Sequence, residues 1–190
     1  MRISYLMTIL PLGVSLSFSQ ATAQSPQRTT VTFNDWTVAC EYPADNKDKT
    51  CELVQMQLLP GQVSPTSQVT VGLPNKERLF KVSIQVPPNV WLAEGVKLLK
   101  DEKDSGVSLT FRWCVAARCL ADSDVKEDAL KRLRDASEIG QLVFKDAKQE
   151  NFVVPVSFRG FGSAFDLLLK ESAGNDVVAS SPAGKSSAKK

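Results

Sequence analysis

The residues best suited to chemistry are four cysteines, arranged in two close pairs. Cys40 and Cys51 enclose ten mostly polar residues, and Cys114 and Cys119 enclose four. Structural zinc sites use tighter Cys-x-x-Cys spacing, and thiol redox centres use that spacing at the start of a helix. Because both pairs are wider, neither a metal site nor a redox centre is favoured. Structural disulfides are the favoured interpretation of all four cysteines.

The strand pattern decides how these cysteines are expected to pair. Four cysteines allow three pairings. Each close pair lies at the ends of a predicted hairpin, and a hairpin brings its two ends within bridging distance. We therefore predict Cys40–Cys51 and Cys114–Cys119 disulfides, which form and persist in an oxidising compartment.

Other catalytic chemistry finds little support. The chain contains no histidine, which excludes Ser-His-Asp and Cys-His catalysis and histidine metal ligands. Carboxylates are numerous, but a glycosidase needs two of them facing one cleft, and the sequence alone pairs none. The charged loops lack the regular oxygen ligands of a calcium-binding EF-hand. We expect no catalytic residues, no metal and no cofactor.

Three tryptophans are the largest aromatic side chains and the main candidates for a binding surface. Trp36 and Trp113 fall on the apolar faces of predicted strands, where core packing is favoured over a binding role. Trp91 lies in PPNVWL, a proline-rich connection between predicted strands. We therefore name Trp91 and Leu92 as the candidate partner-binding residues.

The first 23 residues have the features of a secretory signal peptide. Arg2 precedes a short, interrupted apolar stretch, and the ATA at 21–23 matches an A-x-A cleavage site. No later segment is apolar over the length that a membrane span needs. The formal net charge of the chain is +2, without a concentrated basic face, so nucleic-acid binding is not expected. We predict an exported protein, either periplasmic or secreted to the cell surface.

The elements that position these residues are mostly strands. The clearest is LFKVSIQV at 79–86, whose apolar residues alternate with polar ones as in a half-buried antiparallel strand. Similar patterns predict strands around both cysteine pairs and at 68–73, 96–100, 140–146 and 151–158. Pro155 within the last of these favours an edge position or a bulge.

Two helices interrupt this pattern. Helical spacing predicts the first at 125–135, with Asp124 and Glu127 in a capping-box arrangement. A short second helix after Gly160 is expected to dock Phe161, Phe165, Leu168 and Leu169. These elements predict a mainly β fold, an antiparallel β-sandwich with two accessory helices, in which immunoglobulin-like and jelly-roll strand orders both stay open.

The domain is expected to occupy residues 33–170. A polar lead-in at 24–32 separates it from the signal peptide at 1–23. Residues 171–190 consist mostly of Ser, Ala, Gly and Lys with one short apolar pair, and such a segment buries too little surface to fold. We therefore predict a disordered tail there.

Several motifs together resemble a known family. DWTVACEYPADNKDKTCELVQMQ at 35–57 is similar to the opening of invasion-associated locus B proteins, which are exported by Gram-negative bacteria. Later elements of that family are matched in the same order by RLFKVSIQVPPNVWLAEGVKL at 78–98, RWCVAARCLAD at 112–122, DALKRLRDA at 128–136 and VVPVSFRGFGSAFDLL at 153–168. The VAAR turn lacks a glycine that the family's hairpin often has, which concerns the turn type and not the pairing.

The resemblance implies an immunoglobulin-like β-sandwich with two local disulfides and a periplasmic or surface location. It also implies an accessory role in host-cell entry for some pathogenic members, and no catalytic residues. We therefore expect a non-catalytic exported binding or envelope accessory protein. Its partner, an unknown protein or envelope component, and its oligomeric state are not identified by the sequence.

Two other functions are alternatives to this one. The main alternative is a carboxylate-dependent hydrolase that acts on envelope sugars, which needs a cleft with two carboxylates about 5–10 Å apart. A third is an assembly factor that offers an edge strand to a client protein. Pro155 argues against its own strand serving in that way, because proline lacks the N–H that a new strand would bind.

Overall fold

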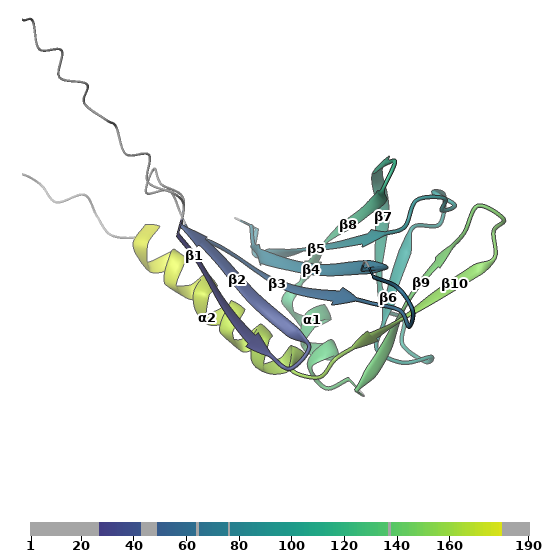
Figure 1. Cartoon of the computed structure of the whole chain (residues 1–190). Helices are drawn as coiled ribbons and strands as arrows, with labels where there is room; N and C mark the ends of the chain where they lie inside the picture. The colour runs from purple at the N-terminus through teal and green to yellow at the C-terminus, as the bar shows by residue number, and fades with distance from the viewer. Residues whose placement is uncertain (1–26, 43–48, 64, 76, 137, 180–190) are drawn as a thin grey trace, which may run out of the picture.

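A computed structural model of the chain describes residues 27–42, 49–63, 65–75, 77–136 and 138–179. The predicted signal peptide at 1–23 and the last part of the predicted tail, 180–190, lie outside the described residues. The described elements follow one another in the order β1 (Gln27–Phe33), β2 (Trp36–Tyr42), β3 (Thr50–Gln57), β4 (Ser67–Pro74), β5 (Leu79–Val86), β6 (Val96–Leu99), β7 (Val107–Val115), β8 (Arg118–Lys126), α1 (Glu127–Arg134), β9 (Ile139–Lys145), β10 (Asn151–Ser157) and α2 (Phe161–Ala179) (Figure 1).

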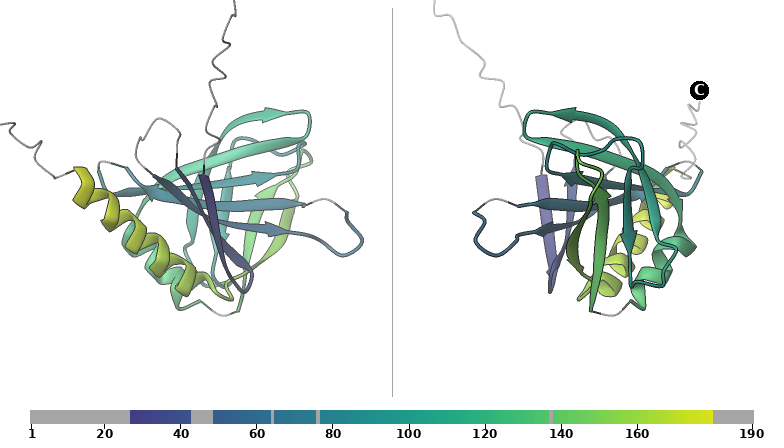
Figure 2. Two further views of the ribbon diagram at one scale, coloured as in Figure 1. Left: turned by 60° about the vertical axis from the view of Figure 1, so that its left-hand side comes forward. Right: turned by 90° about the vertical axis from the view of Figure 1, so that its right-hand side faces the viewer.

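These strands form one antiparallel sheet in the order β1-β2-β3-β4-β5-β8-β7-β6-β9-β10. The sheet curves over itself, so that β10 comes into contact with β3 although six strands separate them in the sheet. Figure 2 shows the resulting two layers from two further directions. The predicted antiparallel β-sandwich with two helices is confirmed. Its strand order is mostly that of successive hairpins, and Pro155 lies in an edge strand, as predicted.

One face of the strands supplies the core. The pattern is clearest in β5, where four alternate residues are almost completely buried: Phe80, Val82, Ile84 and Val86. Helix α2 lies along β1, β2 and β3 on this inner face (Figure 1) and buries Phe161 and Phe165. The Trp36 ring meets Phe161 edge to face, with ring centroids 5.0 Å apart. Burial of such large side chains is the main source of stability in a fold of this kind.

Gly160 joins β10 to α2 and allows this packing. Its φ of 85° lies in the left-handed region, and an added Cβ would be 2.0 Å from the Phe33 carbonyl oxygen. Only glycine fits such a close approach. Beside it, the Ser157 hydroxyl donates to the Asp35 carboxylate at 2.6 Å, and Arg159 Nε donates to the same oxygen at 3.1 Å. The β1–β2 turn is thereby fixed to the start of α2.

Both predicted helices exist, but their starts or ends differ from the prediction. Asp124 belongs to β8 and pairs with Lys81 across the sheet, where their side chains form a 3.0 Å ion pair. Strand pairing therefore replaces the predicted capping box, and the residue before α1 is Lys126, without a side-chain cap.

Helix α2 continues to Ala179, past the predicted start of the tail at 171. There Glu171 forms an ion pair with Lys49, which helps to hold the helix against the sheet.

The polar lead-in prediction was also wrong for residues 27–32. These residues belong to β1, which pairs with β2 from Gln27–Tyr42 to Phe33–Trp36. Almost all of the β1 side chains are exposed. A strand that binds its neighbour through the backbone, with little side-chain burial, leaves no alternation of apolar residues in the sequence.

Candidate functional site

Exposed apolar side chains gather where three connections meet, which we call the loop end. It consists of the β5–β6 connection at 87–95, the β7–β8 turn and the β9–β10 turn. Val86 at the end of β5 pairs with Cys119 at the start of β8, and Val90 forms a bridge with Asp146. The three connections therefore lie together, at the opposite end of the molecule from the C-terminus of α2 (Figure 1).

Trp91 and Leu92, the residues named from the sequence, are exposed at this loop end. Their side chains are 39% and 55% accessible. The Trp91 main chain is held in place, because its N–H donates to the Lys145 carbonyl at 2.8 Å. A fixed backbone that presents an accessible aromatic ring is typical of a binding residue. That these two residues bind a partner stays a prediction.

Trp113, which we assigned to the core, is exposed at the same end. The pairing of β7 with β8 shifts between Phe111 and Trp113, so that Phe111 faces Ala121 and Trp113 faces Leu120. Such a bulge reverses the faces of all later residues in a strand. Trp113 is therefore turned to the solvent face and is 48% accessible. Val115, two residues further along the same strand, is 54% accessible.

The polar groups at the loop end are largely satisfied within the protein. They form close contacts in three pairs: Lys145 with Glu94 at 2.7 Å, Arg112 with Asp122 at 2.7 Å, and Arg118 with Gln85 at 2.6 Å. The same end of the molecule also exposes the apolar side chains of Trp91, Leu92, Trp113 and Val115. Apolar side chains rimmed by paired polar ones are typical of a surface that another molecule covers.

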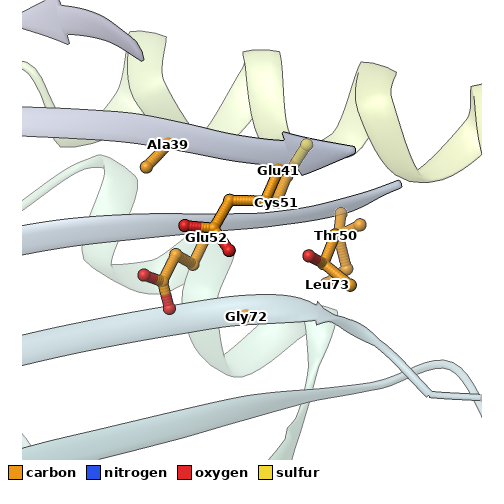
Figure 3. Close-up of a pocket in the computed structure, with 7 residues that line it drawn as sticks. All are labelled: Ala39, Glu41, Thr50, Cys51, Glu52, Gly72 and Leu73. Carbon is orange, nitrogen blue, oxygen red and sulfur yellow. The ribbon is translucent and has the colours of Figure 1, made fainter. Parts of the chain in front are cut away.

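A hollow on the outer face of β2, β3 and β4 contains two carboxylates, those of Glu41 and Glu52 (Figure 3). It forms because the cross-strand neighbours of Glu52 are Ala39 and Gly72, which have no large side chains to fill the space. Burial raises the pKa of Glu52, the nearby Arg28 lowers it, and the nearby Glu41 raises it further. The outcome is a raised pKa, as a general acid would need.

This hollow brings two carboxylates to one site, as the hydrolase hypothesis requires. Glu41 is exposed, however, and lies 3.7 Å from Arg28. The other lining residues are Ala39, Thr50, Cys51, Gly72 and Leu73. No aromatic ring is among these described residues, so the hollow offers little to position a sugar.

The cysteine pairing is confirmed. Cys40 is joined to Cys51 and Cys114 to Cys119, and in each pair the two residues face each other directly across a hairpin. Glu171 lies close to the sulfurs of the first disulfide. Because both sulfurs are bonded to each other, neither is the thiolate that a metal site requires.

A cavity at the end of β3 was missed in the sequence. It has a volume of about 320 Å³ and a floor that includes Gln55 and Gln57. Both glutamines are more than nine-tenths buried, on the face that Cys51 and Leu53 also occupy. Met56 and Leu58, which alternate with these glutamines along the chain, are exposed. The sequence did contain a signal for this cavity. Gln55 and Gln57 continue the alternation of Cys51 and Leu53, which places two polar side chains on the buried face of the strand.

The chain matches the family model described as invasion associated locus B (IalB) protein over residues 36–169. The chain belongs to the IalB family. It is 25% identical over 135 residues to invasion protein B homologs from two strains of Brucella abortus, a match that covers 71% of this chain and 76% of theirs. The family resemblance that was identified from the order of motifs is therefore confirmed.

The IalB fold is also known from a solved structure. The crystal structure of invasion associated protein B from Bartonella henselae superposes with a TM-score of 0.66, covering 77% of this chain and 98% of that chain, at 21% identity. This likeness confirms the fold. None of the helices in the described ranges is long and apolar enough to cross a membrane.

Proposed function

We propose that this IalB protein is a non-catalytic exported binding protein that contacts a protein or envelope component through its loop end. The observation that carries the proposal is the gathering of exposed apolar side chains there. Trp91 and Leu92 lie on the β5–β6 connection, and Trp113 and Val115 lie at the end of β7. Each is at least 39% accessible, and main-chain pairing ties these segments together. Exposed aromatic residues on a rigid support are the usual anchors of protein interfaces.

Export is supported by three observations. The disulfides suit an oxidising compartment. Residues 1–23 have the features of a signal peptide, and membership of the IalB family implies export. The relatives are named as invasion proteins. We therefore extend the proposal to a role in host-cell entry, in which the loop end is the contacting surface. The protein is periplasmic or surface-located and acts by binding, and a direct contact with the host cell requires the surface location.

Crosslinking of the mature protein in its own envelope extract tests the proposal. We expect the double variant W91A/L92A to reduce recovery of the main crosslinked partner about tenfold, equivalent to about 1.4 kcal/mol of binding. The matched control is Val31→Ala, which removes a side chain that is 47% accessible but lies in β1, away from the loop end. Equal recovery of every partner with W91A/L92A and with the control would contradict the proposal.

The carboxylate hydrolase remains a second candidate because Glu41 and Glu52 share one hollow. A raised pKa at Glu52 is the one property of a general acid found there. The test is release of sugars from purified envelope polysaccharide by the mature protein, with Glu52→Gln as the inactive control. Activity that is absent, or that Glu52→Gln retains, excludes this hollow as a hydrolase site.

A further inference from the structure

We propose that the cavity at the end of β3 is a binding site for an extended, uncharged peptide segment of another protein. The site is separate from the loop end and goes beyond the function proposed above. Its walls are Met56, Leu58, Ile139 and Pro155, and its floor includes Gln55 and Gln57. Walls that are mainly apolar, together with a few convergent polar groups, are typical of a ligand site.

The floor offers hydrogen-bond donors that the protein itself does not use. Ser67 Oγ donates to Gln57 Oε1 at 2.7 Å, Gln57 Nε2 donates to Gln55 Oε1 at 2.8 Å, and Gln55 Nε2 donates to the Ser157 carbonyl at 2.7 Å. Each amide NH₂ carries two donors. Within the part of the chain that the structure describes, each glutamine uses one of them. One N–H on each glutamine is therefore available to a carbonyl oxygen in the cavity.

The strand beside the cavity offers an open backbone edge. β2 pairs with β3 only between Thr50 and Val54 among the described residues, so the end of β3 continues past β2. The Gln57 carbonyl accepts a bond from the Thr66 N–H at 2.7 Å and so faces β4. Leu58 is the first residue past β3, so its backbone groups lie outside the β3–β4 pairing. They form no hydrogen bond to any described residue.

A strand edge next to an apolar pocket is the arrangement that binds a peptide by strand addition. The backbone edge supplies affinity and the pocket accepts one or two side chains of the added segment. Met56, Leu58 and Ile139 are each at least 59% accessible, so they can reach such a segment without rearrangement of the core. The site differs from the edge of β10, where Pro155 lacks the N–H that an added strand requires.

The charge of the lining favours a neutral peptide over an anionic amphiphile. Asp35 is the one ionisable residue among the described lining residues. The hydrogen bond from Arg159 holds the pKa of Asp35 below its usual range, and the bond from Ser157 acts in the same direction. The carboxylate is thus ionised and already paired. An anionic headgroup would find no unpaired cation in this lining, whereas amide groups match the glutamine and backbone donors.

NMR of the ¹⁵N-labelled mature protein tests this site directly, because the side-chain amides of Gln55 and Gln57 give their own signals. The probe is a pool of capped, uncharged peptides of about seven residues, with aliphatic or phenylalanine residues alternating with threonine or glutamine. We expect saturable shifts of both side-chain amides and of the Leu58 backbone amide. The same peptides N-methylated at alternate residues should bind about tenfold more weakly, because they lack backbone donors.

Surface variants provide the matched controls. Leu58→Asp and Ile139→Asp change exposed walls of the cavity and should weaken binding at least about tenfold, whereas Val115→Asp changes an equally exposed residue at the loop end and should not. Absence of saturable shifts with the pool, or shifts that Leu58→Asp leaves unchanged, would overturn the proposal. So would shifts of the same amides by dodecanoate in place of the peptides, which would identify an amphiphile site. Loss of the crosslinked partner in W91A/L92A is independent of all these results.

Discussion

The β2–β3 hairpin and the β7–β8 hairpin each contain one disulfide between directly opposed residues, but they are built into the molecule differently. In the first, Cys40 and Cys51 are 5% and 4% accessible and belong to the core beneath α2. In the second, Cys119 is buried while Cys114 and the turn that follows it are exposed. The first disulfide secures the core, and the second secures the base of a projecting turn.

This difference shows that the spacing of a cysteine pair predicts a hairpin but does not predict whether that hairpin belongs to the core or projects into solvent. The tryptophans make the same distinction. Trp36 in the first hairpin is completely buried and donates from Nε1 to the Ser157 carbonyl at 2.8 Å. Trp113 in the second is turned outward by the bulge. We infer that the first hairpin serves stability and the second contributes to binding.

Replacement of the two tryptophans should separate the hairpins most strongly. We expect Trp36→Ala to lower the free energy of unfolding by about 3–5 kcal/mol, because it leaves a cavity and removes the buried hydrogen bond to the Ser157 carbonyl. Trp113→Ala should cost about 1 kcal/mol or less, since half of its surface is already in water. Urea unfolding of the oxidised mature protein measures both. Equal losses would contradict the assignment of different roles.

Removal of each disulfide should give a smaller contrast in the same direction. The chain-entropy model gives about 3 kcal/mol for Cys40→Ala/Cys51→Ala and about 2 kcal/mol for Cys114→Ala/Cys119→Ala, because the second loop is shorter. The first pair also loses buried volume. Thermal unfolding of the two double variants, in the same buffer, measures the difference. A larger loss from the second pair would show that the projecting turn is part of the core.

The pH dependence of stability should reflect the turn that precedes β2. Arg159 and Ser157 lower the pKa of Asp35 in the folded protein. Its contribution is therefore fully present above the unfolded pKa, about 3.9, and is lost as the pH falls toward the lower folded pKa. Because the pair is partly exposed, we expect Asp35→Asn to cost less than about 1 kcal/mol at pH 7 and to flatten the acid limb. An unchanged acid limb would contradict this.

Glu52 on the outer face of β3 should give the smallest effect, with the opposite sign. Burial raises its folded pKa, so the ionised carboxylate destabilises the folded protein as the pH rises through the unfolded pKa toward the folded one. We expect Glu52→Gln to gain a few tenths of a kcal/mol at pH 7, and no difference at a pH below both values. Denaturation at the two pH values measures it. A loss of stability at pH 7 would indicate that the carboxylate has a stabilising partner.

Much of the fold could be predicted because its signals are local. Alternating apolar residues identify β5, and the cysteine spacing identifies both hairpins and, with the other motifs, the family. The errors occurred where tertiary contacts outweigh local pattern. Asp124 does not form the predicted capping box, because it pairs with Lys81 across the sheet. Helix α2 continues beyond residue 171, where Glu171 forms an ion pair with Lys49.

The candidate sites were harder to predict for a related reason. Trp91 could be named as a candidate because it lies in a proline-rich connection between two strands, and it is exposed there. The bulge that exposes Trp113 depends on how β7 pairs with β8, which no single-strand pattern records. The glutamine-floored cavity depends on β10 approaching β3, two segments about a hundred residues apart.

Site-specific photocrosslinking tests the central claim most directly. A photoreactive phenylalanine analogue is placed at Trp91 or Trp113 of the loop end, or at Val31 or Tyr42, which are 47% and 41% accessible elsewhere. If the loop end is the binding surface, irradiation of intact cells should give the same discrete partner adduct from positions 91 and 113, and not from 31 and 42. Adducts from 31 and 42 alone, or none from 91 and 113, would contradict the account.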